Sequence, residues 1–335
     1  MSGKLQLKTW FRVFAAAAFI LPAAGLGILV LLIPGMKDTP PVLDYISSAH
    51  DQAILFSLIL FFMASIFIRR KAIIVVCVLL PAIFWFLSFE QLPVAPRLKG
   101  HSTSAPIRLM TLNARADVDT STDVYLLINE KQPDIICFQE SEPYMLRLAE
   151  TLSEEYPYQV RPESGFGWST MIISRFPLDP VDQAPRRVMA RYEQGSLQSA
   201  VIHLPDGDLL VGCCHIIRGN QNRVIWKAGN RGAFEVADRL GKTAAAMKIP
   251  ALLAGDFNGG PFSIRGRNVR KSDFWLLAQR PTYQSATWPA FLPAFLRVQP
   301  DQIYVTSGIF IADQYASHTA GSDHRPLFVD FTLSR

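Results

Sequence analysis

Hydrophobic residues are distributed differently before and after about residue 90. The N-terminal part contains three long apolar stretches, at about residues 11–33, 53–68 and 72–89. Because about 20 apolar residues cover a hydrocarbon core of about 30 Å, this pattern predicts a membrane anchor of three transmembrane helices over residues 1–90. The first stretch follows a basic N-terminus, which is also typical of a signal peptide. It is long, however, and lacks a clear cleavage site after it, which favours a retained helix.

The basic residues of this part predict its orientation. Lys and Arg are concentrated before the first stretch and in the short link between the second and third. The positive-inside rule assigns both segments to the cytoplasm, and three crossings then leave the rest of the chain outside it. In a bacterium, this describes a multi-pass inner-membrane protein with a periplasmic second domain.

A proline-rich polar linker at residues 91–105 separates the anchor from a folded domain at residues 106–335. Helical spacing occurs at 120–132, 143–155 and 220–242. Apolar runs of strand length occur at 107–114, 134–141, 169–178, 197–204, 208–216, 251–258, 301–306 and 325–333. Strands outnumber helices, and hairpins mix with strand–helix–strand units. The pattern therefore predicts a layered α/β domain with mixed sheets.

Composition supports the division into two parts. Of the 335 residues, 50% are hydrophobic and 18% charged, whereas charged residues make up about a quarter of an ordinary soluble protein. The excess of apolar residues lies before residue 90. The four cysteines, Cys77, Cys137, Cys213 and Cys214, have no zinc-site spacing, and we expect no disulfide framework.

The net charge of +5 arises partly from the predicted anchor. Two basic clusters lie in the second domain, and they consist of Arg186, Arg187 and Arg191, and of Arg265, Arg267, Arg270 and Lys271. A solvated basic surface is the favoured interpretation. The alternative is an electropositive rim that attracts phosphates.

Strong polar side chains recur at the ends of the predicted strands. They are Asn113, Glu140, His215, Asp256, Asn258, Asp301, Asp323 and His324. Each alone is explained as a cap, a surface charge or a half-buried residue, but a layered sheet can bring so many strand ends together at one opening. Asp256 and Asn258 lie two positions apart in a strand-like segment, so we expect them to share a face.

The predicted set is chemically coherent. Carboxylate and carboxamide oxygens suit Mg²⁺ or Mn²⁺ better than zinc. Imidazoles without cysteine partners suit acid–base chemistry or phosphate contacts, and a carboxylate beside His324 would fix its tautomer and raise its basicity. A hard cation, a base and phosphate donors together indicate hydrolysis of a phosphate ester.

The motifs LNARAD, DIICFQES, SRFPL, CCHIIRG, GDFN, DQIYV and SDHRPL occur in this order. With them, the segment from about Ile107 to Phe331 resembles the endonuclease/exonuclease/phosphatase (DNase I-like) superfamily. The resemblance implies a four-layer α/β (α+β) sandwich, in which two mixed β-sheets pack face to face with helices outside. Here three transmembrane helices would precede it, as in a membrane-anchored bacterial member.

The resemblance also implies how the cation and the phosphate are held. Glu140 matches the principal metal-binding glutamate, with Asn113 beside it and Asp323 as a further metal-site carboxylate. Asn258 matches the asparagine that holds the scissile phosphate. His215 matches a histidine that contacts phosphate in some branches, and Asn113 takes part there too.

For catalysis, the resemblance implies that Asp256 orients or activates the attacking water. His324 would be the general base or a phosphate-binding histidine, with Asp301 as its orienting carboxylate. Two positions depart from the family pattern: Arg115 stands where many relatives carry a carboxylate or amide, and Gln302 stands where a histidine is usual.

The aromatic segment 282–304 has two interpretations, packing over the sheet or a lip for a lipid or an unstacked base. We therefore expect a membrane-anchored, Mg²⁺- or Mn²⁺-dependent phosphoesterase that acts on a phosphodiester or phosphomonoester. Its substrate is a nucleic acid, as for a nuclease, or a phospholipid or phosphoinositide head group. A catalytically inactive, membrane-bound binding module is disfavoured because the site residues are intact. No obligate protein partner is evident.

Overall fold

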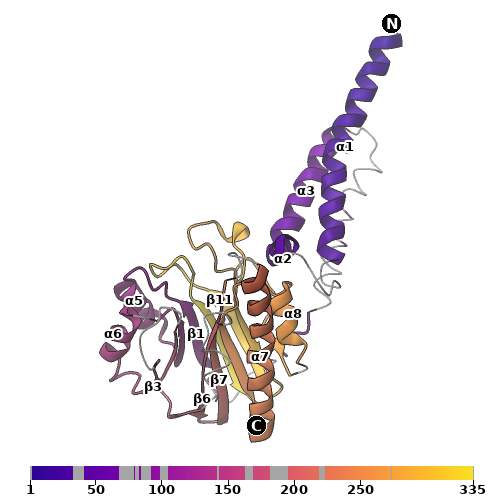
Figure 1. The fold of residues 1–335 in the computed structure, drawn as a ribbon. Helices are drawn as coiled ribbons and strands as arrows, with labels where there is room; N and C mark the ends of the chain where they lie inside the picture. Colours follow the sequence, from indigo (N-terminus) through magenta and orange to yellow (C-terminus); the bar gives the residue numbers. More distant parts are fainter. Residues whose placement is uncertain are drawn as a thin grey trace. The chain divides into compact units, whose positions relative to one another are not determined.

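The structure is a computed structural model, and Figure 1 shows its fold. The chain divides into two compact units, Met1–Leu92 and Pro93–Arg335. The residues that the structure describes are 2–32, 41–67, 79, 83, 92–98, 105–141, 143–162, 169–181, 195–218, 223–272 and 274–334.

The first unit consists of apolar helices. Its described helices are α1 (Ser2–Leu32), α2 (Pro41–Ser48) and α3 (His50–Phe67), and Ala23 of α1 packs against Phe61 of α3. None of these helices alone is both long and apolar enough to cross a membrane, although α2 and Gln52–Phe67, bent by 83°, meet that requirement together. The prediction of three transmembrane helices is therefore not supported by the described helices. Apart from residues 79 and 83, the third predicted span lies outside them.

The second unit contains two six-stranded sheets. The first has the strand order β11 (Ile309–Ala316), β12 (Leu327–Leu333), β1 (Ile107–Asn113), β2 (Ile135–Gln139), β4 (Thr170–Ser174) and β3 (Tyr158–Val160). The second has the order β5 (Leu178–Pro180), β6 (Gly195–Leu204), β7 (Gly207–Ile216), β8 (Ala251–Asp256), β10 (Asp301–Val305) and β9 (Leu276–Leu277). Each sheet has one parallel pair, β1 with β2 and β7 with β8, among antiparallel pairs. The prediction of mixed sheets is confirmed.

The period-two alternation of the strands builds the layers. In β1, Leu109 points into the core between the sheets, where it joins Val211 and Ile303 of the second sheet. The neighbouring Met110 and Leu112 point to the outer face. There they pack with side chains of α5 (Ser121–Lys131) and α6 (Tyr144–Thr151).

The second sheet is covered by α7 (Arg223–Met247), whose Leu240 lies close to Gly212 of β7. The short helix α8 (Ile264–Arg270) packs against α7 (Figure 1). The unit is therefore a sandwich of two mixed sheets flanked by helices.

Several element boundaries differ from the predicted ones. The helix expected at 143–155 covers only Tyr144–Thr151, and the strand expected at 169–178 divides into β4 and β5. The helix expected at 220–242 runs from Arg223 to Met247. Strand β11 was not predicted because a bulge between Ile311 and Asp313 interrupts its alternation. The thiols of Cys137, Cys213 and Cys214 are free.

Candidate active site

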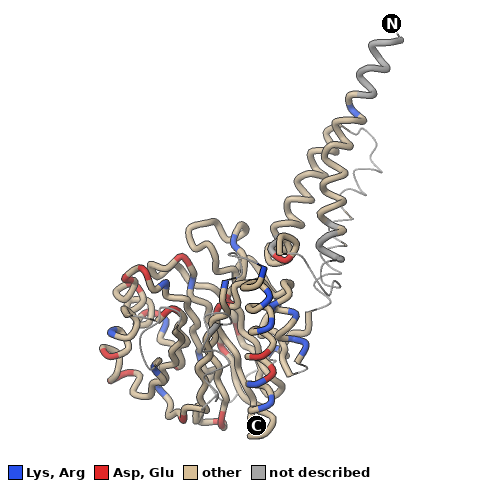
Figure 2. The backbone as a smooth tube through the Cα atoms, viewed as in Figure 1, with Lys and Arg blue, Asp and Glu red and all other residues tan. Residues whose placement is uncertain are grey.

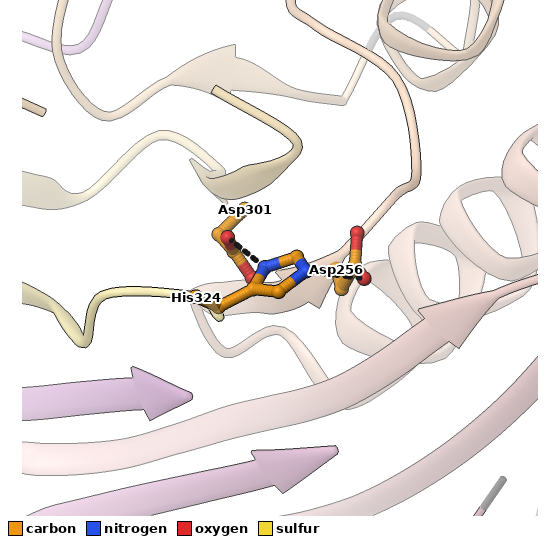
Figure 3. Close-up of side chains that lie close together, drawn as sticks. All are labelled: Asp256, Asp301 and His324. Atoms are coloured by element: carbon orange, nitrogen blue, oxygen red, sulfur yellow. Dashed lines mark hydrogen bonds and ion pairs between the residues drawn. The ribbon is translucent and has the colours of Figure 1, made fainter. Parts of the chain in front are cut away.

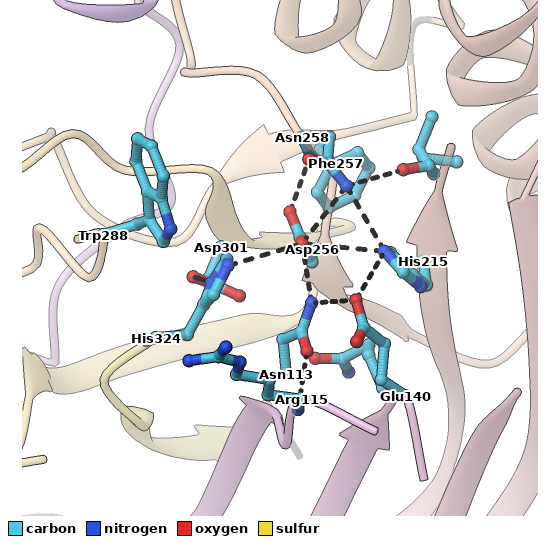
Figure 4. Close-up of polar contacts among 12 residues, drawn as sticks. Asn113, Arg115, Glu140, His215, Asp256, Phe257, Asn258, Trp288, Asp301 and His324 are labelled. Carbon is cyan, nitrogen blue, oxygen red and sulfur yellow. Dashed lines mark hydrogen bonds and ion pairs between the residues drawn. The ribbon is translucent and has the colours of Figure 1, made fainter. Parts of the chain in front are cut away.

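The two parallel strand pairs end at the same place between the sheets. Asn113 is the last residue of β1, and Glu140 directly follows β2. In the other sheet, His215 and Asp256 lie opposite each other near the ends of β7 and β8. Asp301, the first residue of the antiparallel β10, pairs in register with Asp256. Parallel strands present their carboxyl ends at one edge, so these five side chains converge there, with Asn258 and His324 beside them (Figure 4).

The Asn113 carboxamide connects the two sheets. Its Nδ2 donates to Glu140 Oε1 and to Asp256 Oδ2, each at 3.0 Å. On the other side, His215 Nε2 lies 3.8 Å from Glu140 Oε1 and 3.7 Å from Asp256 Oδ2. The backbone N–H of Ala116 donates to Glu140 Oε2. Glu140 and Asp256 are therefore held as neighbouring carboxylates by hydrogen-bond donors.

Asp256 and Asn258 converge for a different reason from the one expected. Strand β8 ends at Asp256, and Asn258 adopts a left-handed backbone with φ of 49°, so strand alternation does not apply. The Asn258 N–H donates to Asp256 Oδ1 at 2.6 Å, which closes a turn through the side chain. The Asn258 carboxamide then donates to the carbonyl of Ile216 and lies 3.3 Å from Asp256 Oδ2.

His324 is paired with a fully buried carboxylate. Its Nδ1 lies 2.8 Å from Asp301 Oδ2 (Figure 3). The Thr287 hydroxyl donates to the same oxygen. Its Nε2 lies 3.9 Å from Asp256 Oδ2, which is longer than a hydrogen bond. The Ser322 hydroxyl accepts from the His324 N–H and donates to the Asn113 carbonyl, so the chain before β12 is tied to β1.

Burial and charge shift the pKa values of these groups in opposite directions. Burial alone would lower the pKa of His324, but the charges of Asp301 and Asp256 raise it to about 9. Burial raises the pKa of Asp301, an effect that the charge of His324 and its hydrogen bond oppose. Burial would also raise the pKa of Asp256, but His324 and His215 lower it below its usual value. Asp256 is therefore ionised.

The chemistry of this cluster fits a divalent cation. One ligand atom from each of Asp256, Asp301 and His324 lies within 4.8 Å of the others. Asp301 Oδ1 is buried and has no hydrogen-bond partner among the described residues. Glu140, with φ of 52°, adopts a strained backbone conformation. Its side chain is partly exposed, which leaves it accessible to an ion. Oxygen donors from several carboxylates are what Mg²⁺ and Mn²⁺ prefer.

The contact described for the Asp323 carboxylate is with Trp288, not with the other predicted metal ligands. Its Oδ2 accepts a hydrogen bond from Trp288 Nε1 at 3.2 Å. Among the described residues, no hydrogen bond or ion pair joins it to Glu140 or Asn113. Arg115, one of the two departures from the family pattern, turns its guanidinium to the exposed Asp117.

Gln302, the other departure, supports the loop after β8. Its amide donates to the carbonyl of Gly259 and accepts from the Tyr304 hydroxyl. Sequence reasoning did not identify Thr287 or Ser322 as site residues, because a single Ser or Thr in a loop carries no spacing signal, and it considered Trp288 only as part of the aromatic segment. The Trp288 ring centroid lies 6.4 Å from that of His324, and the Arg218 guanidinium lies over the Trp288 ring at 5.6 Å.

The arginines of the basic cluster at Arg265 are not the solvated surface that we favoured, although Lys271 is exposed. Helices α7 and α8 do carry many Lys and Arg residues (Figure 2). Arg265, however, is only 2% exposed, and its Nη1 donates to the carbonyls of Phe257 and Asn258. Arg267 and Arg270 also donate to backbone carbonyls. The physical reason is that the loop after β8 has carbonyls that need donors. The cluster at 186–191 lies outside the described residues.

The aromatic segment 282–304 is only partly packed over the sheet. Trp288 is half-buried, but Phe291 is 80%, Phe295 55% and Leu296 43% exposed. We call these three residues the apolar lip. Arg297 donates to the carbonyls of Leu292 and Ala286, which braces the backbone that carries the lip. The lip is therefore an exposed apolar surface on a backbone that Arg297 hydrogen-bonds.

Comparison with known families agrees with this fold and site. The model of the endonuclease/exonuclease/phosphatase family matches residues 110–324, and the chain belongs to this family. The match covers the segment that contains all the candidate site residues from Asn113 to His324. No curated protein sequence matches the chain at a significant level.

Solved structures share the fold at low sequence identity. The human nocturnin catalytic domain with bound sulfate is 20% identical, with a TM-score of 0.54, and the match covers 69% of this chain and 94% of that one. TDP2 from D. rerio, complexed with a single-strand DNA product, is 14% identical, with a TM-score of 0.55 and coverage of 68% and 100%. An endonuclease/exonuclease/phosphatase from Bacteroides vulgatus is 17% identical, with a TM-score of 0.54 and coverage of 69% and 100%. At these identities the likeness shows the fold.

Proposed function

We propose that this protein is a divalent-metal-dependent phosphoesterase that hydrolyses a phosphodiester or phosphomonoester by attack of water. The observation that carries the proposal is the convergence of Glu140, Asp256, Asn258 and His324 from both sheets at one position. Glu140, with Asn113 beside it, would hold the cation. A bound Mg²⁺ or Mn²⁺ would supply positive charge to the phosphoryl oxygens and acidify a bound water.

The protein side chains at the site have separate roles in the proposed reaction. Asp256, which is ionised and buried, accepts a proton from the attacking water and orients it. The carboxamide of Asn258 and the imidazole of His215 contact phosphoryl oxygens. His324 donates its Nε2–H to a phosphoryl oxygen as negative charge develops there, while Asp301 fixes the ring at Nδ1. Asp323 lies at the edge of the site beside Trp288.

Hydrolysis assays test this function. The full chain, purified in detergent, is assayed with Mg²⁺ or Mn²⁺ and with EDTA against DNA, RNA, phosphoinositides and sphingomyelin. The proposal expects hydrolysis of at least one substrate, blocked by EDTA. If no phosphoester in this panel is cleaved under any metal condition, the chain is instead a binding module on a phosphoesterase fold.

A phospholipid head group is the substrate class that the apolar lip favours. Phe291, Phe295 and Leu296 offer a desolvated surface that suits acyl chains, and phosphate-rich nucleic acid would require a basic groove instead. The likeness to TDP2, solved with a single-strand DNA product, supports the nucleic-acid alternative.

The lip itself separates the two substrates. Replacing Phe291 and Phe295 with Ser should lower the hydrolysis of phospholipid in vesicles by about tenfold or more, and leave the hydrolysis of a soluble phosphoester unchanged. Equal activity of wild type and variant on vesicles, with hydrolysis of DNA or RNA, would favour the nuclease.

We also propose that the apolar N-terminal unit anchors the protein in the inner membrane of a bacterium, with the second unit in the periplasm. The basic residues that flank its apolar stretches support this orientation.

A further inference from the structure

The loop after β8, residues 257–262, has a backbone whose carbonyls are satisfied by named donors. Arg265 Nη1 donates to the carbonyls of Phe257 and Asn258, at 2.9 and 3.0 Å. The other donors are Gln302 to Gly259, Ser263 N–H to Gly260, Arg270 to Pro261 and Arg267 to Phe262. The carbonyls therefore point toward these donors, and the carboxamide of Asn258 lies in the site, where it donates to the Ile216 carbonyl and lies 3.3 Å from Asp256 Oδ2.

Arg265 holds the part of this loop that matters most for Asn258. Its guanidinium is buried, and Nη1 donates both to the carbonyl of the 257–258 peptide bond and to that of the 258–259 peptide bond. Its Nε donates to Asn230 Oδ1 of α7, so the loop is connected to a long helix. Asn adopts a φ of 49° more readily than most residues with a Cβ, and the donors to the Phe257 and Asn258 carbonyls hold the backbone in this one conformation.

The surroundings of Arg265 leave little room for any other arrangement. A Cβ added at Gly229 of α7 would lie 2.6 Å from Arg265 Nη2 and 2.9 Å from the Ile217 carbonyl. The adjacent Ile216 carbonyl accepts the Asn258 carboxamide. Helix α7 therefore lies against the Arg265 guanidinium, and the guanidinium in turn contacts the backbone of Asn258.

We propose that Arg265 is a positioning residue for phosphate binding, which fixes the left-handed backbone of Asn258 and aims its carboxamide at a phosphoryl oxygen. This inference rests on the proposed function. A Lys at this position keeps the charge but provides one donor group instead of a planar fork, so it is unable to hold both carbonyls and Asn230 together. The result is a misaimed carboxamide with the other site residues in place.

The experiment compares Arg265→Lys with Arg108→Lys in the full chain. Arg108 is a matched control because its guanidinium donates to Asp330 and to the carbonyl of Lys131, and both contacts lie outside the site. Hydrolysis of the best substrate should fall about 10- to 100-fold in kcat/KM for Arg265→Lys, and stay near the wild-type value for Arg108→Lys. Gly229→Ala, which displaces the guanidinium from the other side, should resemble Arg265→Lys.

A double-mutant cycle distinguishes positioning from general loosening of the fold. If Arg265 acts through Asn258, Arg265→Lys causes little further loss in an Asn258→Ala background. Full additivity of the two losses would overturn the inference, as would wild-type kcat/KM in Arg265→Lys.

Amide hydrogen exchange provides a readout that is independent of activity. The Asn258 N–H, which is bonded to Asp256, should exchange faster in Arg265→Lys than in Arg108→Lys. Unchanged exchange in residues 257–262 contradicts the positioning role even if the protein hydrolyses nothing. Faster exchange without hydrolysis by the wild type contradicts the proposed function and leaves the support of the loop by Arg265 intact.

Discussion

Two clusters of the second unit contain the same three side chains, one histidine between two aspartates. The buried cluster consists of Asp256, Asp301 and His324, and the exposed cluster consists of Asp179, His203 and Asp208. In both, a ring Nδ1 lies 2.8 Å from a carboxylate oxygen, and in both the aspartates raise the pKa of the histidine. The side chains of the buried cluster are 10% exposed or less, whereas those of the exposed cluster are at least 41% exposed.

The difference lies in what remains available to a ligand. Both ring nitrogens of His203 contact carboxylates, Nδ1 that of Asp208 and Nε2 that of Asp179 at 3.1 Å. His324 uses only Nδ1 in this way, and its Nε2 is too far from Asp256 for a hydrogen bond. Water screens the interactions between the charges of the exposed cluster, whereas the interactions within the buried cluster are screened much less. The same residue types therefore form a surface ion pair in one place and a candidate reactive centre in the other.

The largest expected effect is a difference in catalytic activity between variants of the two clusters. His324→Ala should reduce phosphoester hydrolysis by about 10²- to 10⁴-fold, because it removes the donor to the developing charge. His203→Ala, its matched control, should retain wild-type activity. Steady-state kcat/KM on the best substrate measures both, and an equal loss in the two variants would remove the distinction between the clusters.

A smaller effect is expected when Asp301 loses its charge. Asp301→Asn keeps the shape of the side chain but removes the charge that raises the pKa of His324. NMR titration of the metal-free protein should show that this pKa falls from about 9 toward the ordinary histidine value, and kcat should fall about 10- to 100-fold. A His324 titration identical to that of the wild type would contradict the pairing.

The stability of the metal-free protein should depend on pH through His324. Its pKa of about 9 in the folded protein lies above the ordinary histidine value of 6.5, so its contribution is fully present below about pH 6.5. The contribution is lost as the pH rises to about 9. We expect the free energy of unfolding to fall by an amount on the order of 3 kcal/mol over this range. Urea unfolding in EDTA measures this decrease, and the prediction fails if His324→Gln shows the same decrease.

The smallest effect is expected in the exposed cluster. His203 is solvent-exposed, so His203→Gln should leave the midpoint of thermal unfolding at neutral pH close to that of the wild type. A large decrease would mean that this cluster contributes to the stability of the sheet through strands β5 and β6, contrary to the prediction. Differential scanning fluorimetry of the two proteins under identical conditions provides the measurement.

Much of the site could be predicted from the sequence, because its residues follow apolar runs that read as buried strands. Asn113 and Glu140 end one parallel pair, and His215 and Asp256 end the other, so sheet topology brings them together. The His324–Asp301 pairing was also expected, and the structure confirms the contact.

The remainder depends on backbone geometry and on long-range packing. The left-handed conformations of Glu140 and Asn258 leave no trace in hydrophobic periodicity. The sequence presents Arg265 as one of several clustered charges, and only the folded loop shows that it is buried against carbonyls. The apolar lip has the composition of a packed segment, and only the folded chain shows that its side chains are exposed.

The role of the candidate cation in hydrolysis is tested most directly by removing and restoring metal. Wild-type full chain is treated with EDTA, and phosphoester hydrolysis is then measured on addition of Mg²⁺ or Mn²⁺, in parallel with Glu140→Ala. We predict that the wild type loses activity and recovers it with either ion, whereas the Glu140→Ala variant recovers little. Full activity in EDTA, or equal recovery in both proteins, would contradict a metal-dependent phosphoesterase site at Glu140.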